Sequence, residues 1–336
     1  MPTSRILYLT SSTSDYLADS LFHGLRSLLG AEVVDYPKCE ILYKNGNAVP
    51  SSRVHGKGFT CYGLLDDIAV DRYDIFGKVQ RGFFDLVIFS SIHRQFGLYV
   101  QFLPWLRARR TLIIDGEDVP AIYPYRGLFW RRPYWGLLPR AHNRFLYFKR
   151  EWTPATIRYR WFLMPPRWLA ARMPAPRNLR RISFSIPAEK IAPEPPAKTK
   201  LFPRHIVDPE VAEHVPDSAT DHVFDNERDY YADLRASRFG ISVKRAGWDA
   251  IRHYELAASG CVLCFRDLDK KPATCAPDGL DDTNAIIYHN RQELMAKIER
   301  LPDVEYARLQ AGALAWVRQH TTVKRAEQLL EFIPTK

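Results

Sequence analysis

The sequence predicts an α/β fold with two Rossmann-like domains, and three observations support it. A strand, turn, helix and strand follow one another between residues 237 and 265, and a similar strand–helix–strand pattern opens the chain at residues 5–35. A proline-rich stretch, residues 186–200, separates the two patterns. The chain of 336 residues is long enough for two domains with a core each. We therefore place the first domain at residues 1–185 and the second at residues 186–336.

The second domain is organised around one βαβ unit. Alternating apolar residues from Phe239 to Val243 indicate a half-buried strand, and the basic turn Lys244 to Gly247 follows it. The pattern predicts a helix from Trp248 to Ser259, with Gly260 in the left-handed conformation just after it. A short buried strand, Cys261 to Phe265, completes the unit, so the two strands should be parallel.

The turn after the first strand of this unit is suited to an anion. Ligands of such units lie beyond the carboxyl ends of the strands, where the N-terminus of the helix offers unpaired N–H groups. Gly247 allows a close approach of the backbone, and Lys244 and Arg245 add positive charge. We expect a phosphate or pyrophosphate there.

Arg252 and Glu255 are three residues apart, so they share a face of the predicted helix and can pair. Two interpretations remain open from the spacing alone. The residues form a surface ion pair, or Glu255 accepts hydrogen bonds from sugar hydroxyls beside a phosphate site.

The run from Gly247 to Cys261, GWDAIRHYELAASGC, resembles the G-x-D-x-x-R-x-x-E-x-x-A-x-G signature of GT-B glycosyltransferases. It is most similar to the spore-maturation-protein-like and exostosin-like groups, whose C-terminal domain is of the family 1 type, and the resemblance is specific over residues 224–288. It implies that this helix and the turn before it hold a nucleotide-sugar donor. Arg252 would then face the diphosphate, and Glu255 the ribose or the donor sugar.

The retaining members have two glutamates about eight residues apart, whereas position 247 is Gly here. The departure leaves the retaining or inverting outcome open. The candidate donor-binding residues of the second domain are Lys244, Arg245, Gly247, Asp249, Arg252, Glu255 and Asn284.

The first domain begins with a strand from Arg5 to Thr10, a polar turn and a helix from Tyr16 to Leu29. Further strands are expected at Phe84 to Phe89 and at Leu112 to Asp115. No G-x-G-x-x-G is present, which argues against a dinucleotide cofactor.

Acidic residues and one histidine follow the carboxyl ends of these strands, and we expect them around one cleft. An inverting transfer needs one general base to take the proton of the acceptor hydroxyl. The candidate catalytic residues are Asp15, His93, Asp115, Glu117 and Asp118.

The stretch from Asp115 to Asp118 has two further interpretations. It mimics a D-x-D motif that holds Mg²⁺ or Mn²⁺, or it caps a turn. The resemblance to GT-B enzymes implies work without a bound metal, so we expect neither a metal nor another cofactor.

Residues 122–183 form a basic, aromatic-rich segment, which we interpret as an insertion in the first domain. It holds fourteen Arg or Lys residues, a single acid, Glu151, and fourteen aromatic residues, while the formal net charge of the whole chain is only +10. Such a surface suits an anionic membrane, single-stranded nucleic acid or an internal interface. We favour the membrane, with nucleic acid as the main rival. The candidate membrane or acceptor residues are Trp130, Arg131, Arg132, Trp135, Trp161 and Trp168.

Five scattered cysteines, no apolar run of 18 residues and an N-terminus that reads as a strand favour a cytoplasmic protein, peripheral on the inner face of the membrane. Cys261 and Cys264 are expected to be buried thiols rather than a redox or zinc pair.

The rest of the second domain shows further periodic segments. A strand is expected at Phe202 to Asp208 and another at Asn284 to Tyr288. The expected helices are residues 226–236, 291–301, 304–320 and 322–332, the last of which packs back on the first domain.

The sequence therefore predicts a glycosyltransferase that moves a sugar from a nucleotide-sugar to a hydroxyl acceptor, a glycan or a lipid-linked sugar. A nucleic-acid-binding or nucleic-acid-glycosylating protein and a non-catalytic GT-B-like binding module are the alternatives.

Overall fold

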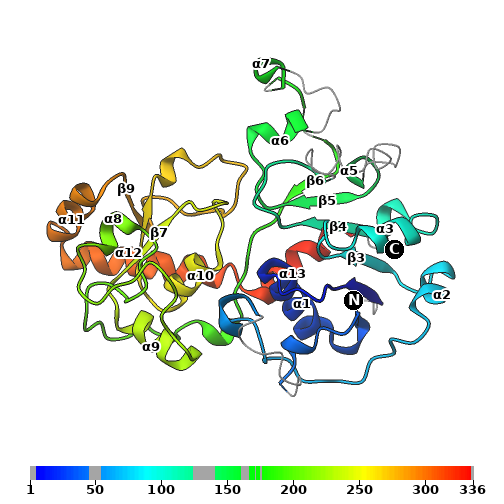
Figure 1. Ribbon diagram of the computed structural model, residues 1–336, viewed down its shortest axis with the longest axis horizontal. Coiled ribbons are helices and arrows are strands. Elements are labelled where there is room, and N and C mark those ends of the chain that lie inside the picture. Colours follow the sequence, from blue (N-terminus) through cyan, green and yellow to red (C-terminus); the bar gives the residue numbers. More distant parts are fainter. Residues whose placement is uncertain are drawn as a thin grey trace.

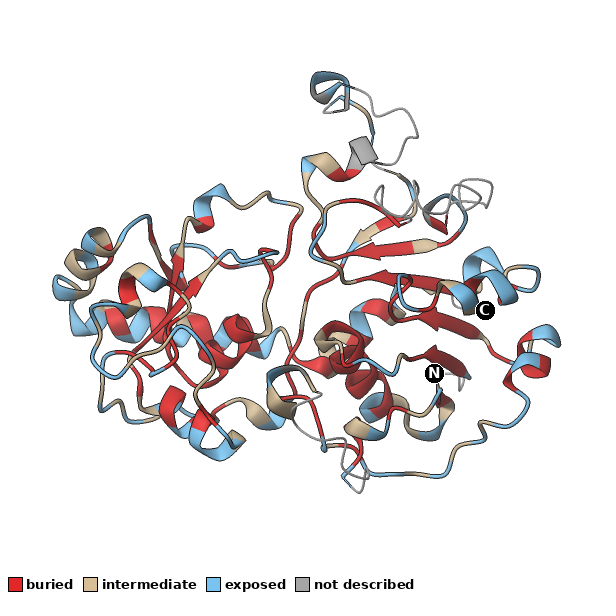
Figure 2. Ribbon diagram, in the orientation of Figure 1, coloured by how far each residue is buried: buried red, intermediate tan, exposed pale blue. Residues whose placement is uncertain are grey.

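The computed structural model describes residues 5–44, 54–123, 141–159, 166–170, 172–174 and 176–333. Within these residues, two parallel β-sheets lie side by side, each covered by helices on both faces (Figure 1). The strands of both sheets are largely buried (Figure 2). The α/β prediction and its two Rossmann-like parts are confirmed.

The first sheet has six strands in the order β2-β1-β3-β4-β5-β6. All of its neighbouring strands are parallel. The strands are β1 (Ile6–Leu9), β2 (Val33–Tyr36), β3 (Leu86–Phe89), β4 (Thr111–Asp115), β5 (Leu146–Lys149) and β6 (Leu179–Arg181). The second sheet has three parallel strands in the order β7-β8-β9, which are β7 (Phe239–Val243), β8 (Val262–Arg266) and β9 (Ala285–Tyr288).

The α-helices of the first half of the chain are α1 (Tyr16–Leu29), α2 (Ile75–Gln80), α3 (Phe96–Phe102), α5 (Ala141–Arg144), α6 (Pro154–Tyr159) and α7 (Arg167–Ala170). Those that follow in the chain are α8 (Pro209–Ala212), α9 (Glu227–Ala236), α10 (Ile251–Ala258), α11 (Arg291–Glu299), α12 (Asp303–Arg318) and α13 (Thr322–Leu330). Within the described residues, no helix combines the length and the apolar character needed to cross a membrane.

Alternating residues of each strand pack into two different hydrophobic cores, because successive side chains of a strand point to opposite faces of the sheet. On the first sheet, Tyr8 and Ile88 pack toward α1 and α13, while Leu9 and Phe89 pack toward α2 and α3. The second sheet is built in the same way, with Phe265 facing the α9, α10 and α12 side.

The last helix returns to the first sheet, as the sequence predicts. A Cβ built on Gly24 of α1 would lie 1.9 Å from the carbonyl oxygen of Thr322, so only glycine allows this approach of α13. The Nδ1 atom of His23 lies 2.9 Å from the hydroxyl of Thr322. The division of the chain at residue 186 stays a prediction, and α13 is the part of the second half that packs on the first sheet.

Two predicted elements are wrong. Residues 202–208 form no strand, because their pairing is limited to an isolated bridge between His205 and Ala219. The helix predicted to begin at Trp248 begins at Ile251, for a reason given below. Gly260 does follow this helix with a φ of 69°, and all five cysteines are free and buried.

Candidate active site

The predicted catalytic residues lie along one edge of the first sheet, where the carboxyl ends of β1, β3, β4 and β5 meet. Ion pairs join neighbouring strand ends along this edge. Arg94, after β3, contacts Asp15 at 2.5 Å, and His93 Nδ1 lies 3.5 Å from the carboxylate of Glu117, which follows β4. The side chains of His93 and Glu117 are 42% and 32% exposed, so this pair faces solvent. The five residues therefore follow one edge, and His93 and Glu117 form a pair that faces solvent.

Asp15 also has a structural role. Its side chain caps α1 by accepting hydrogen bonds from the backbone N–H groups of Leu17 and Ala18. A capping carboxylate that also pairs with an arginine is held in place. This makes Asp15 a weaker candidate for proton transfer than His93.

Asp115 is buried at the end of β4 and is surrounded by donors. Its carboxylate accepts a hydrogen bond of 2.8 Å from Lys149 and one of 2.5 Å from the hydroxyl of Tyr147. The Lys149 ammonium therefore neutralises the carboxylate of Asp115. Among the described residues, the group of His, Cys, Asp and Glu side chains that comes close enough for a metal is Asp267, Asp269 and His289, on the second sheet's side and partly exposed.

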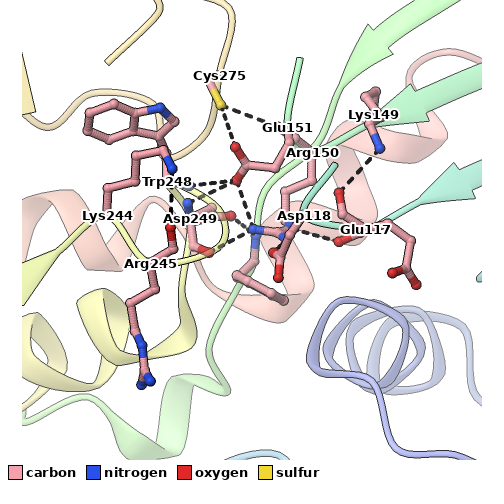
Figure 3. A network of polar contacts seen from close by, with 12 residues as sticks. Glu117, Asp118, Lys149, Arg150, Glu151, Lys244, Arg245, Trp248, Asp249 and Cys275 are labelled. Carbon is pink, nitrogen blue, oxygen red and sulfur yellow. Dashed lines mark hydrogen bonds and ion pairs between the residues drawn. The ribbon is translucent and has the colours of Figure 1, made fainter. Parts of the chain in front are cut away.

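Arg150 connects the two parts of the molecule (Figure 3). Its guanidinium is buried and donates to the carbonyl oxygen of Gly116 at 2.9 Å and to that of Asp249 at 2.7 Å. It also pairs with Asp118 and with Glu151. Asp118, predicted as catalytic, is thus placed at the junction of the two parts.

Glu151, which follows β5, contacts the turn after β7. Its Oε1 accepts hydrogen bonds from the backbone N–H groups of Trp248 at 2.8 Å and Asp249 at 3.2 Å, and its Oε2 accepts one from Cys275 at 3.0 Å. These amides would be the first of the predicted helix. Ala250 has an extended backbone, with a φ of −146° and a ψ of 144°, so the regular helix starts at Ile251.

Gly247 lies against the carboxylates of Glu151 and Asp118. A Cβ built on it would be 2.4 Å from Glu151 Oε1 and 2.9 Å from Asp118 Oδ1. The close approach expected of this glycine is thus made to two carboxylates of the first domain. Lys244 and Arg245, before it in the same turn, are exposed.

Asp249 is buried, and its carboxylate contacts protein groups. It accepts hydrogen bonds from the backbone N–H of Phe184 at 2.8 Å and from the hydroxyl of Tyr254 at 2.9 Å. Burial raises the pKa of Asp249 to about 6, although the charge of Arg150 opposes the shift. Asp249, predicted to bind the donor, here holds the segment that leads into the second part.

Arg252 is buried on α10, only 8% exposed. One terminal nitrogen lies 3.1 Å from Nδ1 of His205 and 3.2 Å from the hydroxyl of Tyr230, and the other donates to the carbonyl oxygen of His205. Its Nε has no partner. Burial, followed by the charge of Arg252, lowers the pKa of His205 to about 3, so the imidazole is neutral beside the guanidinium.

Glu255 is also buried, 4% exposed, one turn further along α10. Its two oxygens accept hydrogen bonds from the hydroxyls of Thr60 and Tyr230, the latter at 2.6 Å. Burial raises the pKa of Glu255, and these hydrogen bonds act in the opposite direction. Arg252 and Glu255 thus share a face, as expected, but the hydroxyl of Tyr230 bridges them in place of a direct hydrogen bond.

The other predicted residues lie apart from this cluster. The side chain of Asn284 closes its own turn, donating to the carbonyl oxygen of Gly279 at 2.7 Å. Trp168, on α7, is 63% exposed. The remaining membrane or acceptor candidates, Trp130, Arg131, Arg132, Trp135 and Trp161, lie outside the described residues.

Sequence reasoning missed several residues of the site. Glu151 carried a signal, because it is the single acid of the basic segment. The sequence carried no such signal for Thr60, His205 and Tyr230. Their contacts with α10 form only in the folded protein.

The fold is that of the GT-B glycosyltransferases, in which two Rossmann-like domains face each other. HepE (Alr3699) of Anabaena, crystallised with UDP and glucose, superposes with a TM-score of 0.52 at 10% identity and 98% coverage of both chains. A glycosyltransferase of Rickettsia africae ESF-5 gives a TM-score of 0.53 at 9% identity, with 100% of both chains covered. At sequence identities of 9% and 10%, the similarity to these two structures shows a shared fold.

The sequence itself gives one family match. Residues 211–331 match the family model described as glycosyl transferase-like, and these residues include the turn after β7 and the whole of α10. No curated protein matches the chain. The match to the particular spore-maturation or exostosin-like groups stays a prediction.

Proposed function

We propose that this protein is a glycosyltransferase that moves a sugar from a nucleotide-sugar donor to a hydroxyl group of an acceptor. One observation carries the proposal, the buried Arg252 with an unpartnered Nε beside a buried carboxylate, Glu255, that is held by hydroxyl groups. A cation for phosphate and an acid for sugar hydroxyls are what a nucleotide-sugar requires. The family match over residues 211–331 and the UDP-glucose complex of HepE support the same chemistry.

The donor is assigned to the second domain, residues 186–336. Arg252, with the exposed Lys244 and Arg245, would neutralise the negative charge that develops on the leaving nucleoside diphosphate. Glu255 would accept hydrogen bonds from the ribose or from the donor sugar.

The acceptor is assigned to the first domain, residues 1–185, with His93 as the general base. The acceptor hydroxyl oxygen would bond to the anomeric carbon as the bond from that carbon to the phosphate oxygen breaks. The hydroxyl proton passes to the imidazole of His93, and the electron pair leaves with the diphosphate. Glu117, 3.5 Å from Nδ1, would stabilise the imidazolium that forms.

We also propose that transfer proceeds without a divalent metal. Lys149 and Arg150 already place two cations among the acids at the ends of β4 and β5. Asp115, the first acid of the D-x-D-like stretch, is neutralised by Lys149.

The proposed acceptor is a lipid-linked or envelope glycan at an anionic membrane surface on the cytoplasmic side. In Figure 1, α6 and α7 project beyond the edge of the first sheet. Trp168 and Leu169 of α7 are exposed by 63% and 40%, and the side chain of Arg172 lies over the Trp168 ring. An exposed aromatic ring beside cations suits the headgroup region of a membrane.

The test is calorimetric binding of UDP-, GDP-, ADP-, dTDP- and CMP-sugars to the wild type, Arg252→Ala and Glu255→Ala. We expect one nucleotide to bind and each substitution to weaken it at least about 10-fold, as for a lost charged contact. Arg308→Ala, which changes an exposed arginine of α12 that pairs with Glu305, serves as the control.

Three other outcomes would contradict the proposal. Binding of oligonucleotides with no nucleotide-sugar would favour the nucleic-acid alternative. Binding of a donor without any turnover on sugar acceptors would favour a non-catalytic module. Donor binding that both substitutions leave unchanged would place the site elsewhere.

A further inference from the structure

A first-domain segment, residues 56–63, crosses to the second domain and covers the Arg252–Glu255 cluster. Phe59 is buried in the hydrophobic core of the second domain, where its ring lies 5.3 Å from that of His222 and 5.8 Å from that of Tyr230. Lys57 donates to the carbonyl oxygen of Phe224 at 2.7 Å. The segment is thus attached to the second domain on both sides of Gly58.

Thr60 of this segment occupies a hydrogen-bonding position of Glu255. Its hydroxyl donates to Oε1 of Glu255 and lies 3.0 Å from the hydroxyl of Tyr231. Its backbone N–H donates to Glu227 at 2.6 Å. Both oxygens of the buried Glu255 therefore contact hydroxyl groups of the protein itself, one from each domain.

The hydroxyls of Thr60 and Tyr230 donate two hydrogen bonds to Glu255. The two hydroxyls of a ribose would donate the same pair of hydrogen bonds to a carboxylate. Glu255 is only 4% exposed, so a nucleoside can reach it only if one of the present partners withdraws. Tyr230 lies within α9, whereas Thr60 belongs to a loop, although its neighbours Phe59 and Cys61 pack in the second and the first core. Of the two partners, Thr60 is the one outside regular secondary structure, and its withdrawal from Glu255 would draw Phe59 out of the second core.

The unpartnered Nε of Arg252 is a second, independent sign of a ligand. It belongs to a buried guanidinium on the same helix, whose other nitrogens are bound by His205 and Tyr230. A buried N–H group without a partner is rare in a folded protein. It leaves one hydrogen bond open for an acceptor atom of a ligand, such as a phosphate oxygen.

We propose that residues 56–63 form a lid that closes the donor site in the donor-free protein, and that the ribose hydroxyls of the donor displace the Thr60 hydroxyl from Glu255. The lid rests on the donor site of the proposed function. The donor would thus open the site by replacing one hydroxyl partner with its own.

The backbone of the lid is locally strained. Lys57 and Thr60, neither of which is glycine, have φ angles of 57° and 71°, in the left-handed region that side chains disfavour. The outer contact of the lid, between Lys57 and Asp225, is an ion pair whose acid is 94% exposed, and such pairs are weak. The closed conformation is held by contacts with the second domain against local strain.

The experiment compares Thr60→Val with Thr60→Ser. Valine keeps the shape of threonine and its branching at Cβ but removes the hydroxyl, whereas serine keeps the hydroxyl. The probe is the tightest binder among UDP, GDP, ADP and dTDP, measured by calorimetry, with hydrogen exchange of residues 54–63 as the second readout. We expect about 3- to 10-fold tighter binding to Thr60→Val, because the ligand no longer competes with a closed lid.

Thr60→Ser should bind as the wild type does, and the probe should increase hydrogen exchange in residues 54–63. Lys57→Ala removes the outer contact of the lid and leaves the contacts of Glu255 unchanged. It should therefore also tighten binding of the probe. This variant replaces Thr60→Val in the experiment if Thr60→Val does not fold. Binding of the probe to Thr60→Val but not to the wild type would also support the lid.

Two results would overturn the lid while the proposed function stands. In the first, the wild type binds the probe through Arg252, but Thr60→Val and Lys57→Ala bind it equally or more weakly. In the second, the probe reduces hydrogen exchange of residues 54–63, which means that the segment closes on the ligand. If neither the wild type nor any variant binds a nucleotide, the proposed function fails, and the lid with it.

Discussion

The carboxylate of Glu151 lies where a side chain of residue 247 would begin. A Cβ at Gly247 would stand 2.4 Å from Oε1 of Glu151, although the two residues are 96 positions apart and belong to different domains. The same oxygen accepts hydrogen bonds from the amides of Trp248 and Asp249. The carboxylate of Glu151 therefore leaves no room for a side chain at position 247.

We predict that Gly247→Ala destabilises the protein. The end of a glutamate can usually move aside, but Glu151 is 3% exposed and bound on both oxygens, so the new methyl group overpacks a closed site. The expected loss in the free energy of unfolding is about 1–3 kcal/mol, measured by urea titration.

A double-mutant cycle tests the cause of that loss. Glu151→Ala makes room for the methyl group, so the double variant should lose less stability than the two single losses together, by at least about 0.5 kcal/mol. Gly97→Ala is the control, because its Cβ would meet no atom within 4 Å. Additive losses would mean that the contact between residues 151 and 247 is not the cause.

For the acid–base pair, we predict that His93→Ala lowers kcat by about 10²- to 10⁴-fold, the usual contribution of a general base. Glu117→Gln should lower kcat by a smaller factor, since Glu117 acts through His93. The dissociation constant of the donor, from calorimetry, should not change in either variant. A His93→Ala enzyme with the wild-type kcat would remove His93 from the mechanism.

The stability of the protein should depend on Asp19. This residue of α1 is buried, and burial raises its pKa from 3.8 to about 7, while a hydrogen bond from the backbone of Asp15 opposes the shift. Because the folded protein binds the proton more tightly, the contribution of Asp19 to stability is complete below about pH 4. It is lost as the pH rises toward 7.

Comparison of the wild type with Asp19→Asn tests whether this contribution to stability falls as the pH rises. The free energy of unfolding of the wild type minus that of the variant should fall between pH 4 and pH 8 by up to about 4 kcal/mol, at 1.36 kcal/mol for each unit of pKa. Urea titrations at pH 4.5, 6 and 8 measure it. A difference that is constant across this range, or that rises with pH, would show that Asp19 does not titrate in this way.

The membrane proposal predicts that Trp168→Ala weakens binding to anionic phospholipid vesicles by about 3- to 10-fold, from the loss of one buried aromatic side chain. Binding should also fall as salt is raised from 0.1 to 0.5 M, because the lipid charges are screened. Vesicle co-sedimentation measures both. Trp105, 40% exposed beyond α3, provides the control Trp105→Ala. An equal loss for both tryptophans, or equal binding to neutral vesicles, would contradict the proposal.

The local patterns of the chain predicted the strands and helices of the βαβ unit well. Alternation between Phe239 and Val243 gave β7 with its observed bounds, and Gly260 ended α10 as expected. The predicted start of α10 was wrong because the backbone of Ala250 is extended, and Trp248 and Asp249 before it bind Glu151, a contact that no local pattern encodes. The strand expected at residues 202–208 was wrong because this apolar stretch packs against the second sheet without joining it.

The sequence by itself determined the two Rossmann-like parts, the basic turn and α10 with Arg252 and Glu255, because periodicity and motif spacing are local properties of the chain. Only the tertiary structure decided which groups meet. It set His93 beside Glu117, Glu151 against Gly247, and Thr60 on Glu255. The physical reason is that these contacts join residues far apart in sequence, and they form only when the parallel strands align their carboxyl ends and the two domains close on each other.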